Sequence, residues 1–228
     1  MLPSHERRGP PRALRRRDTG WCADHDRVRI GVLGICGGGG YAWAAAKTEK
    51  RFKAVASMTG VNYGRMSRDN AGLAGGPLEV LRGIAQQRTA EVRGEGEQAL
   101  NAALPPSAEV AQEIGDIDVI EAYDYYCTPR AQHENAPATF DVSHGASTQA
   151  WDAFAFAEDL LDQPLLVVGD KKGGFGAYGD GQEIHRRAAS TDKQLVVLEG
   201  ASHYDIYDQP NGAGEALKHA IPFFTEKL

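Results

Sequence analysis

One stretch near the start of the chain, RIGVLGICGGGGYAWAAAKTEK, runs from apolar residues into four glycines and then into helix-forming residues. Residues 27–33 alternate and then become fully apolar, which predicts a buried strand. Residues 41–50 favour a helix, and residues 52–60, FKAVASMTG, predict a second buried strand. Strand, helix and strand within about 35 residues form a βαβ unit, whose two strands run parallel. The chain is therefore constrained to an α/β fold built on a mostly parallel sheet.

The same pattern returns in the second half of the chain. Residues 148–161 predict an amphipathic helix, and two further apolar runs predict buried strands at 164–170 and 193–200. Helices are expected over 182–190, after a glycine-rich loop, and over 212–228 at the end of the chain. The sequence thus predicts four strands, two in each half.

Residues 61–150, which separate the two halves, have a different pattern. They predict helices divided by glycine and proline breaks, with no convincing strand, and a long ordered loop at 127–145. We therefore expect an α/β core made of residues 24–62 and 146–228, with a helical cap inserted at 63–145.

The first residues of the chain lack any apolar period. Residues 1–20 contain three prolines and six arginines against Glu6 and Asp18. This composition predicts that residues 1–23 form a disordered or non-native leader. The formal net charge of the 228-residue chain is −6, and no basic stripe interleaved with aromatic residues occurs, which argues against a nucleic-acid partner.

Cysteine usage and apolar run length bear on the compartment. The three cysteines, Cys22, Cys36 and Cys127, are odd in number, far apart and without metal-ligand spacing. They predict neither a disulfide framework nor a structural metal, and they favour a reduced, cytoplasmic setting. No apolar run reaches the 18 residues of a membrane span, so no membrane partner is expected.

Cys36 stands where the first strand turns into the helix. A nucleophile on such a tight turn needs small residues two positions before and after it, and Gly34 and Gly38 meet that requirement. The helix N-terminus is expected to lower the pKa of the thiol, and the N–H of Gly37 would help to form an oxyanion hole. The pattern predicts a cysteine nucleophile.

Two other interpretations of the glycines remain open. They could serve only close packing between helix and sheet, with Cys36 a small core residue. Alternatively, residues 37–42 fit the dinucleotide fingerprint GxGxxA, although the following strand ends in SMTGVN without the carboxylate that would bind a ribose.

A histidine near the carboxyl end supports the nucleophile. His203 follows the apolar strand KQLVVLEG on a turn, where the general base of a nucleophile–acid–histidine order belongs. The acid should follow the strand at 164–170. Asp170 ends that strand and is favoured over Asp180, which could equally be a helix N-cap.

Four segments, RIGVLGICGGGGYA, KAVASMTGVNYGR, YYCTPRAQHENAP and LEGASHYDIYDQP, together resemble the α/β-hydrolases. More narrowly, they resemble the dienelactone-hydrolase-like and polyketide-transferase-like members with a helical cap. The resemblance covers residue 24 to the C-terminus. It implies hydrolysis or acyl transfer on an ester, lactone or thioester without metal or cofactor, with Cys36 as nucleophile and His203 as base.

The family normally has about four strands before the nucleophile, whereas 26 residues precede the first strand here. We therefore expect a partial sheet that lacks the N-terminal strands. The strand leading to Cys36 would then be an exposed edge, which a second copy of the chain could cover.

The first functional hypothesis is a hydrolase of a small-molecule acyl substrate. Tyr41, Tyr63 and Trp151, together with Tyr125 and Tyr126, are expected to line the acyl pocket. The alternative is a catalytically inactive truncated hydrolase or a binding subunit that keeps the turn by descent.

Overall fold

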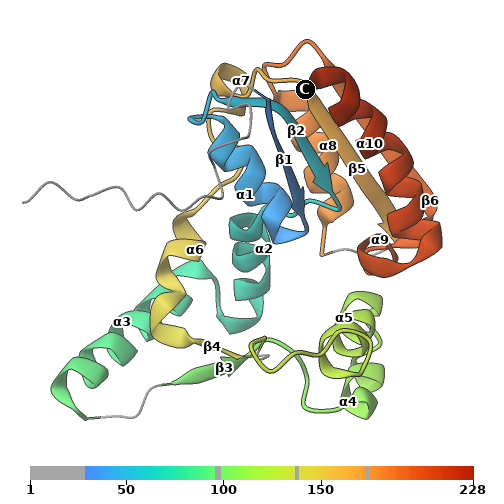
Figure 1. Ribbon diagram of the computed structural model, residues 1–228. Helices are drawn as coiled ribbons and strands as arrows, with labels where there is room; N and C mark the ends of the chain where they lie inside the picture. Colours follow the sequence, from blue (N-terminus) through green and yellow to red (C-terminus); the bar gives the residue numbers. More distant parts are fainter. Residues whose placement is uncertain (1–28, 96–98, 137–138, 173–174) are drawn as a thin grey trace, which may run out of the picture.

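A parallel sheet forms the centre of the protein, as the computed structural model in Figure 1 shows; it describes residues 29–95, 99–136, 139–172 and 175–228. The sheet has four strands in the order β1–β2–β5–β6, all parallel. Their bounds are Ile30–Ile35 (β1), Phe52–Met58 (β2), Leu165–Lys172 (β5) and Lys193–Ser202 (β6). The four predicted strands and the α/β class are confirmed. The expected leader at 1–23 and the start of the first strand lie outside the described residues.

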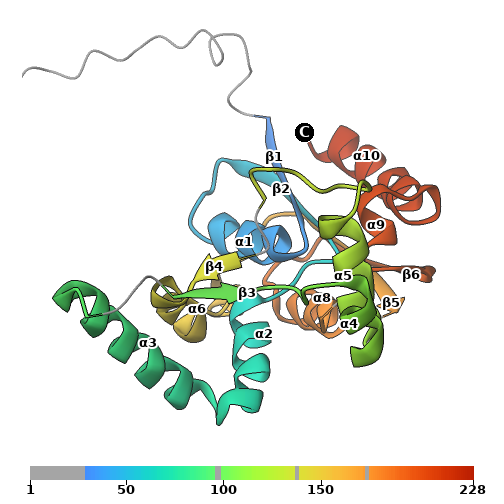
Figure 2. The same ribbon diagram turned by 90° about the horizontal axis from the view of Figure 1, so that it is seen from below.

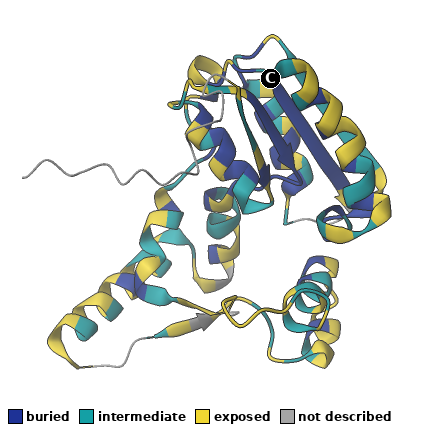
Figure 3. Cartoon of the chain, in the orientation of Figure 1, coloured by how far each residue is buried: buried dark blue, intermediate teal, exposed yellow. Residues whose placement is uncertain are grey.

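Helices cover both faces of this sheet. Helices α1 (Gly37–Ala46) and α8 (Ala177–Arg187) pack on one face, and α10 (Glu215–Lys227) packs on the other. Because successive residues of a strand point to opposite faces, β2 and β5 contribute to two separate cores. One core contains Trp43, Val55, Leu165, Val167 and Ile184. The other contains Ala54, Ala56, Leu166, Val168 and Phe223. Figure 3 shows the two central strands, β2 and β5, as largely buried.

Glycines allow α1 to lie unusually close to the sheet. The helix spans Gly37–Ala46, so it begins four residues before the start that the sequence predicts. A Cβ on Gly34 would lie 2.1 Å from the carbonyl oxygen of Gly38, and one on Gly39 would lie 2.6 Å from Cα of Gly60. A Cβ on Gly38 itself would meet nothing within 4 Å. Close packing therefore accounts for Gly34 and Gly39, whereas Gly38 faces open space.

A largely helical segment follows β2 and lies beyond the carboxyl ends of the strands (Figures 1 and 2). Its helices are α2 (Tyr63–Asn70), α3 (Pro77–Arg93), α4 (Ala108–Ile114) and α5 (Ile117–Cys127), with short 3₁₀ turns at Ala71–Ala74 and Val142–His144. The prediction that this segment has no strand was wrong. Strands β3 (Leu100–Ala102) and β4 (Thr139–Asp141) pair antiparallel. Each has three residues, too few to show the alternation that marks a strand in sequence.

The single helix expected before β5 is broken into α6 (Ala146–Ala150) and α7 (Ala157–Leu160). At the break, Oδ1 of Asp152 accepts a hydrogen bond from the backbone N–H of Phe154 at 2.9 Å. The ammonium group of Lys47 also binds two carbonyl oxygens of the break, at 3.0 and 2.7 Å. These side chains satisfy backbone groups that a continuous helix would have paired internally, so the helix stops.

The chain closes with a short helix α9 (Asp205–Asp208), a wide turn at Pro210–Gly214, and α10. Within the described ranges, no helix is both long enough and apolar enough to cross a bilayer.

Candidate active site

Four side chains gather where the four parallel strands end. Cys36 follows β1, Thr59 follows β2, Asp170 lies near the end of β5, and His203 follows β6. The carboxyl ends of parallel strands share one edge of the sheet, which is the usual place for a site in an α/β protein. The structure thus brings Cys36, Asp170 and His203 to one edge and adds Thr59.

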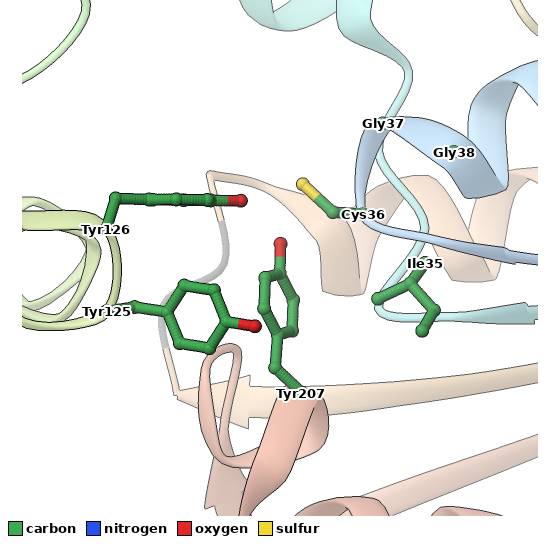
Figure 4. A pocket seen from close by; sticks show the side chains of 7 residues that line it. All are labelled: Ile35, Cys36, Gly37, Gly38, Tyr125, Tyr126 and Tyr207. Atoms are coloured by element: carbon green, nitrogen blue, oxygen red, sulfur yellow. The ribbon is translucent and has the colours of Figure 1, made fainter. Parts of the chain in front are cut away.

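Cys36 occupies a strained turn between β1 and α1. Its φ is 52° and its ψ is −128°, a backbone conformation that costs energy for any residue with a Cβ. The backbone of Cys36 is held on both sides: its N–H donates to the carbonyl of Met58 at 3.1 Å, and its carbonyl accepts from Gly39 and Val61 at 2.8 and 2.9 Å. The sulfur points into a pocket (Figure 4). The turn therefore presents the thiol rather than burying it in the packing.

His203 and Asp170 are fully buried but do not meet directly. Nδ1 of His203 lies 3.8 Å from Oδ2 of Asp170, which is too long for a hydrogen bond. The hydroxyl of Thr59 lies between them, 2.5 Å from each atom. Thr59 has a φ of 45°, which is rare for a β-branched residue. The strand end after β2 is strained so that this hydroxyl bridges the acid and the imidazole.

The other side of the imidazole meets a tyrosine instead of the thiol. Nε2 of His203 lies 3.1 Å from the hydroxyl of Tyr207, and that hydroxyl acts on the thiol of Cys36, whose pKa it lowers. Figure 4 shows the Tyr207 hydroxyl directed at the sulfur. Hydrogen bonds thus join Asp170, Thr59, His203 and Tyr207 in that order, and the Tyr207 hydroxyl faces the thiol of Cys36.

Burial dominates the protonation of these groups. It raises the pKa of the Cys36 thiol, although the Tyr207 hydroxyl and the N–H of Gly37 act in the opposite direction. The helix terminus acts in the expected direction through the N–H of Gly37, but desolvation of the thiolate outweighs it, so the net lowering of this pKa that the sequence predicted is not found. Burial lowers the pKa of His203 to about 4 and raises that of Asp170 to about 6. Near neutral pH, the resting site therefore holds a neutral thiol beside a neutral imidazole.

Asp180, the other candidate acid, has a different place. Its carboxylate pairs with the guanidinium of Arg65 at 2.8 Å and accepts the backbone N–H of Asn62 at 2.8 Å. These contacts join α8 to the start of α2. Of the two candidates, Asp170 is the one that reaches His203 through Thr59.

The pocket beside the sulfur has a volume of about 390 Å³. Its lining residues are Ile35, Cys36, Gly37, Gly38, Tyr125, Tyr126 and Tyr207. None of these side chains carries a formal charge at neutral pH, and the two tyrosines of α5 reach it from the helical segment.

Of the five aromatic residues expected in the pocket, Tyr125 and Tyr126 line it. The rings of Tyr41 and Trp151 pack on each other at 5.1 Å and are not part of the lining. The ring of Tyr63 lies against the α1 turn, 3.5 Å from where a Cβ on Gly37 would be, outside the lining itself. Within the described part of the chain, no three His, Cys, Asp or Glu side chains come together to hold a metal ion.

No protein-family model matches the sequence. The chain is 32% identical over 206 residues to the uncharacterized protein YcjY of Escherichia coli K12, covering 89% of this chain and 65% of that protein. It is 29% identical over 191 residues to the uncharacterized protein PA2218 of Pseudomonas aeruginosa PAO1, covering 81% of this chain and 49% of that protein. The chain therefore spans less than two thirds of the length of each of these curated relatives, and about half of PA2218.

Solved structures identify the fold. The crystal structure of PA2218 superposes with a TM-score of 0.73 at 24% identity, covering 92% of this chain and 64% of that one. The α/β hydrolase GrgF from Penicillium sp. sh18 superposes with a TM-score of 0.60 at 16% identity, covering 89% and 65% of the two chains. A soluble variant of the monoglyceride lipase of Saccharomyces cerevisiae gives 0.57 at 10% identity, covering 86% and 62%. The chain has the α/β-hydrolase fold.

The strand-to-helix turn at Cys36 has the strand–turn–helix geometry that a nucleophile elbow requires. The prediction of the fold and of a partial sheet is confirmed, while the narrower dienelactone-hydrolase-like assignment stays a prediction.

Thr59 and Tyr207 were not predicted from the sequence as site residues. Thr59 directly follows a predicted strand, at the same sheet edge as the other three strand ends. Tyr207 lies four residues after His203, a spacing that places two side chains on one face of a helical turn.

Proposed function

We propose that the protein is a hydrolase of small, uncharged esters or thioesters, lactones included, with Cys36 as its nucleophile. One observation carries the proposal. The strained turn presents the sulfur of Cys36 to a pocket, where it faces the Tyr207 hydroxyl that lies 3.1 Å from Nε2 of His203. Strain of this kind persists in a fold where the surrounding structure holds it, and it clusters at active sites.

The reaction has two stages. In the first, the sulfur of Cys36 attacks the acyl carbon, its proton passes toward His203, and the N–H of Gly37 stabilises the oxyanion. The bond to the leaving oxygen or sulfur breaks, and that group departs with the proton from His203. In the second stage, His203 takes a proton from water and the resulting hydroxide attacks the thioester. The carbon–sulfur bond breaks, the carboxylic acid product leaves, and the proton on His203 returns to the sulfur of Cys36.

The remaining polar groups orient the base. Asp170 acts on the imidazole through Thr59, so it is a positioning residue. The pocket supports an acyl group of modest size, since its volume is about 390 Å³ and its lining offers aromatic rings and no charge. A carboxylated or phosphorylated substrate would find no cationic partner in that lining.

The free thiols suit a reducing compartment, so the cytoplasm belongs to the proposal. Besides Cys36, the described residues include one more free cysteine, Cys127.

The test is turnover of p-nitrophenyl acetate by the wild type and by Cys36→Ala, with Cys127→Ala as the matched control. Cys127 ends α5 and is a half-buried free thiol outside the pocket lining. We expect turnover to disappear in Cys36→Ala and to persist in Cys127→Ala. Mass spectrometry of the acid-quenched wild type should find the acetyl group on Cys36.

Two outcomes would contradict the proposal. Turnover that Cys36→Ala leaves unchanged would exclude the thiol as nucleophile. A folded wild type that neither turns over nor acetylates Cys36 with p-nitrophenyl acetate or an activated thioester would favour the alternative, a non-catalytic binding subunit.

A further inference from the structure

We propose that Tyr207 is a catalytic residue that relays the proton from the thiol of Cys36 to Nε2 of His203. The inference rests on the proposed function, in which Cys36 is the nucleophile. It assigns to a phenol the step that a cysteine–histidine pair in direct contact would perform alone.

Both ring nitrogens of His203 are occupied. The Thr59 hydroxyl lies 2.5 Å from Nδ1, and the Tyr207 hydroxyl lies 3.1 Å from Nε2. The Tyr207 hydroxyl also faces the Cys36 thiol (Figure 4) and lowers its pKa. The phenol therefore lies between the sulfur and Nε2, where it can take a proton from one and give a proton to the other.

Counting protons fixes the direction of each hydrogen bond. A hydroxyl has one proton to donate, and a neutral imidazole has one N–H. If Thr59 donates to the carboxylate of Asp170, it accepts from Nδ1–H of His203. Nε2 then accepts from the Tyr207 hydroxyl, whose oxygen accepts the S–H of Cys36. Every donor along the chain then has an acceptor, while Oδ1 of Asp170 has no hydrogen-bond partner among the described residues.

The relay moves two protons in one direction. As the sulfur attacks, the S–H proton passes to the Tyr207 oxygen, and the Tyr207 proton passes to Nε2. The thiol becomes a thioester sulfur, the imidazole becomes an imidazolium, and the phenol ends neutral as it began. Burial raises the pKa of Tyr207, so a free phenolate is disfavoured and the two transfers are concerted.

The packing of Tyr207 holds its side chain in place beside the thiol and the imidazole, as a proton relay requires. Its ring lies 4.9 Å from that of Tyr204 and 5.0 Å, edge on, from that of Tyr125. The end of α9 is also anchored, because Arg130 binds the carboxylate of Asp208, the residue after Tyr207, at 2.6 and 2.9 Å.

The first test measures the rate of acyl-enzyme formation with p-nitrophenyl acetate by stopped flow, in Tyr207→Phe and in the control Tyr204→Phe. Tyr204 is a buried neighbour whose ring lies 5.1 Å from His203 and whose side chain is not in the relay. We expect Tyr207→Phe to lower the rate about 10²-fold, the usual contribution of a positioned proton-transfer group. Tyr204→Phe should stay within about threefold of the wild type. A Tyr207→Phe enzyme that acylates as fast as Tyr204→Phe would overturn the relay.

A second measurement needs no variant, so it holds even if Tyr207→Phe folds poorly. In mixtures of light and heavy water, two protons in flight give a curved dependence of the wild-type acylation rate on the deuterium fraction. A straight line, which indicates one proton, would contradict the relay.

The third measurement does not depend on ester turnover. Alkylation of Cys36 by iodoacetamide, followed by peptide mass spectrometry, reports how readily the thiolate forms. Tyr207→Phe removes a hydrogen-bond donor to that thiolate, and we expect alkylation to slow about tenfold. Faster alkylation would show that Tyr207 only obstructs the sulfur.

The two proposals can fail separately. If Cys36→Ala keeps the burst of p-nitrophenol, the nucleophile assignment fails. If Cys36→Ala and His203→Ala both lose the burst while Tyr207→Phe keeps it, the relay alone fails.

Discussion

The close approach of α1 to the sheet makes a prediction about two glycines of the same turn, Gly34 and Gly38. Gly34→Ala should destabilise the protein, whereas Gly38→Ala should leave its stability unchanged or raise it. The two substitutions add the same methyl group, two residues on either side of Cys36.

The magnitudes follow from the space at each position. A Cβ on Gly34 would lie 2.1 Å from the carbonyl oxygen and 2.4 Å from the carbonyl carbon of Gly38, where ordinary contact begins near 3.4 Å. Both are backbone atoms of α1, so no side chain can rotate away and the helix itself must move by more than an ångström. Overpacking typically costs about 1–3 kcal/mol, and we expect the upper end, about 3 kcal/mol. Alanine at position 38 meets nothing within 4 Å and lies in a helix, where it should contribute about 0.5–1 kcal/mol relative to glycine.

The assay is equilibrium urea denaturation at one pH, followed by circular dichroism. With a slope of about 2–3 kcal/mol per molar urea, Gly34→Ala should lower the midpoint by about 1–1.5 M. Activity is not the readout, because Gly38 lines the pocket. A Gly34→Ala protein within about 0.5 kcal/mol of the wild type would refute the reasoning, as would equal losses at both positions.

Three further predictions concern the charges and surfaces around the site. His203 has a pKa of about 4 in the folded protein, below its ordinary 6.5, so the unfolded chain takes up the proton first and stability falls as pH drops across that window. Asp170, raised to about 6 from 3.8, has the opposite effect, because its folded form keeps a proton that the unfolded chain has lost. Between about pH 4 and 6, the free energy of unfolding of Asp170→Asn, relative to the wild type, should therefore rise with pH, and that of His203→Gln should fall. Urea denaturation at several pH values measures both differences. If the two differences changed with pH in the same direction, the reasoning would be wrong. Strand β1 is an edge of the described sheet, and Leu33 on it is 43% exposed, so we expect a second copy of the chain to cover it. Leu33→Lys should therefore shift the molecular mass measured by light scattering toward that of the monomer. A wild type that is already monomeric would contradict this. Arg130→Met removes the hydrogen bonds to the carboxylate of Asp208 and to the carbonyl of Tyr204. KM for p-nitrophenyl acetate should rise severalfold, while the free energy of unfolding falls by at most about 1 kcal/mol. An unchanged KM would exclude a role of Arg130 in holding α9.

The core of the fold could be predicted because buried parallel strands leave a clear pattern in the sequence. PLLVVG is a continuous apolar run, and FKAVASM is apolar except at Lys53 and Ser57, as expected for strands covered on both faces. The start of α1 was placed four residues late because glycine has low helix propensity. Here tertiary contact overrides propensity, since a side chain at Gly34 or Gly39 would collide with the neighbouring backbone.

The site was predictable in part. Small residues around Cys36, and strand ends before Asp170 and His203, place three groups at one sheet edge. No local sequence pattern predicts which side chains are hydrogen-bonded to one another in the site. This pairing depends on the 3.8 Å gap between Asp170 and His203, which one hydroxyl fills, and on the turn of α9 that brings a phenol to the sulfur. Such intervals are set by how the strands stagger, and the sequence carries no separate signal for them.

The bend at Cys36 is fixed entirely by main-chain partners, through its own N–H and carbonyl. Whatever residue stands there is therefore aimed at the same point in space. Exchanging sulfur for oxygen with Cys36→Ser would alter the reactivity of the attacking atom without re-aiming it. The fold is thus a simple starting point for laboratory evolution. One codon change replaces the attacking atom, and later selection would act on the groups that transfer its proton.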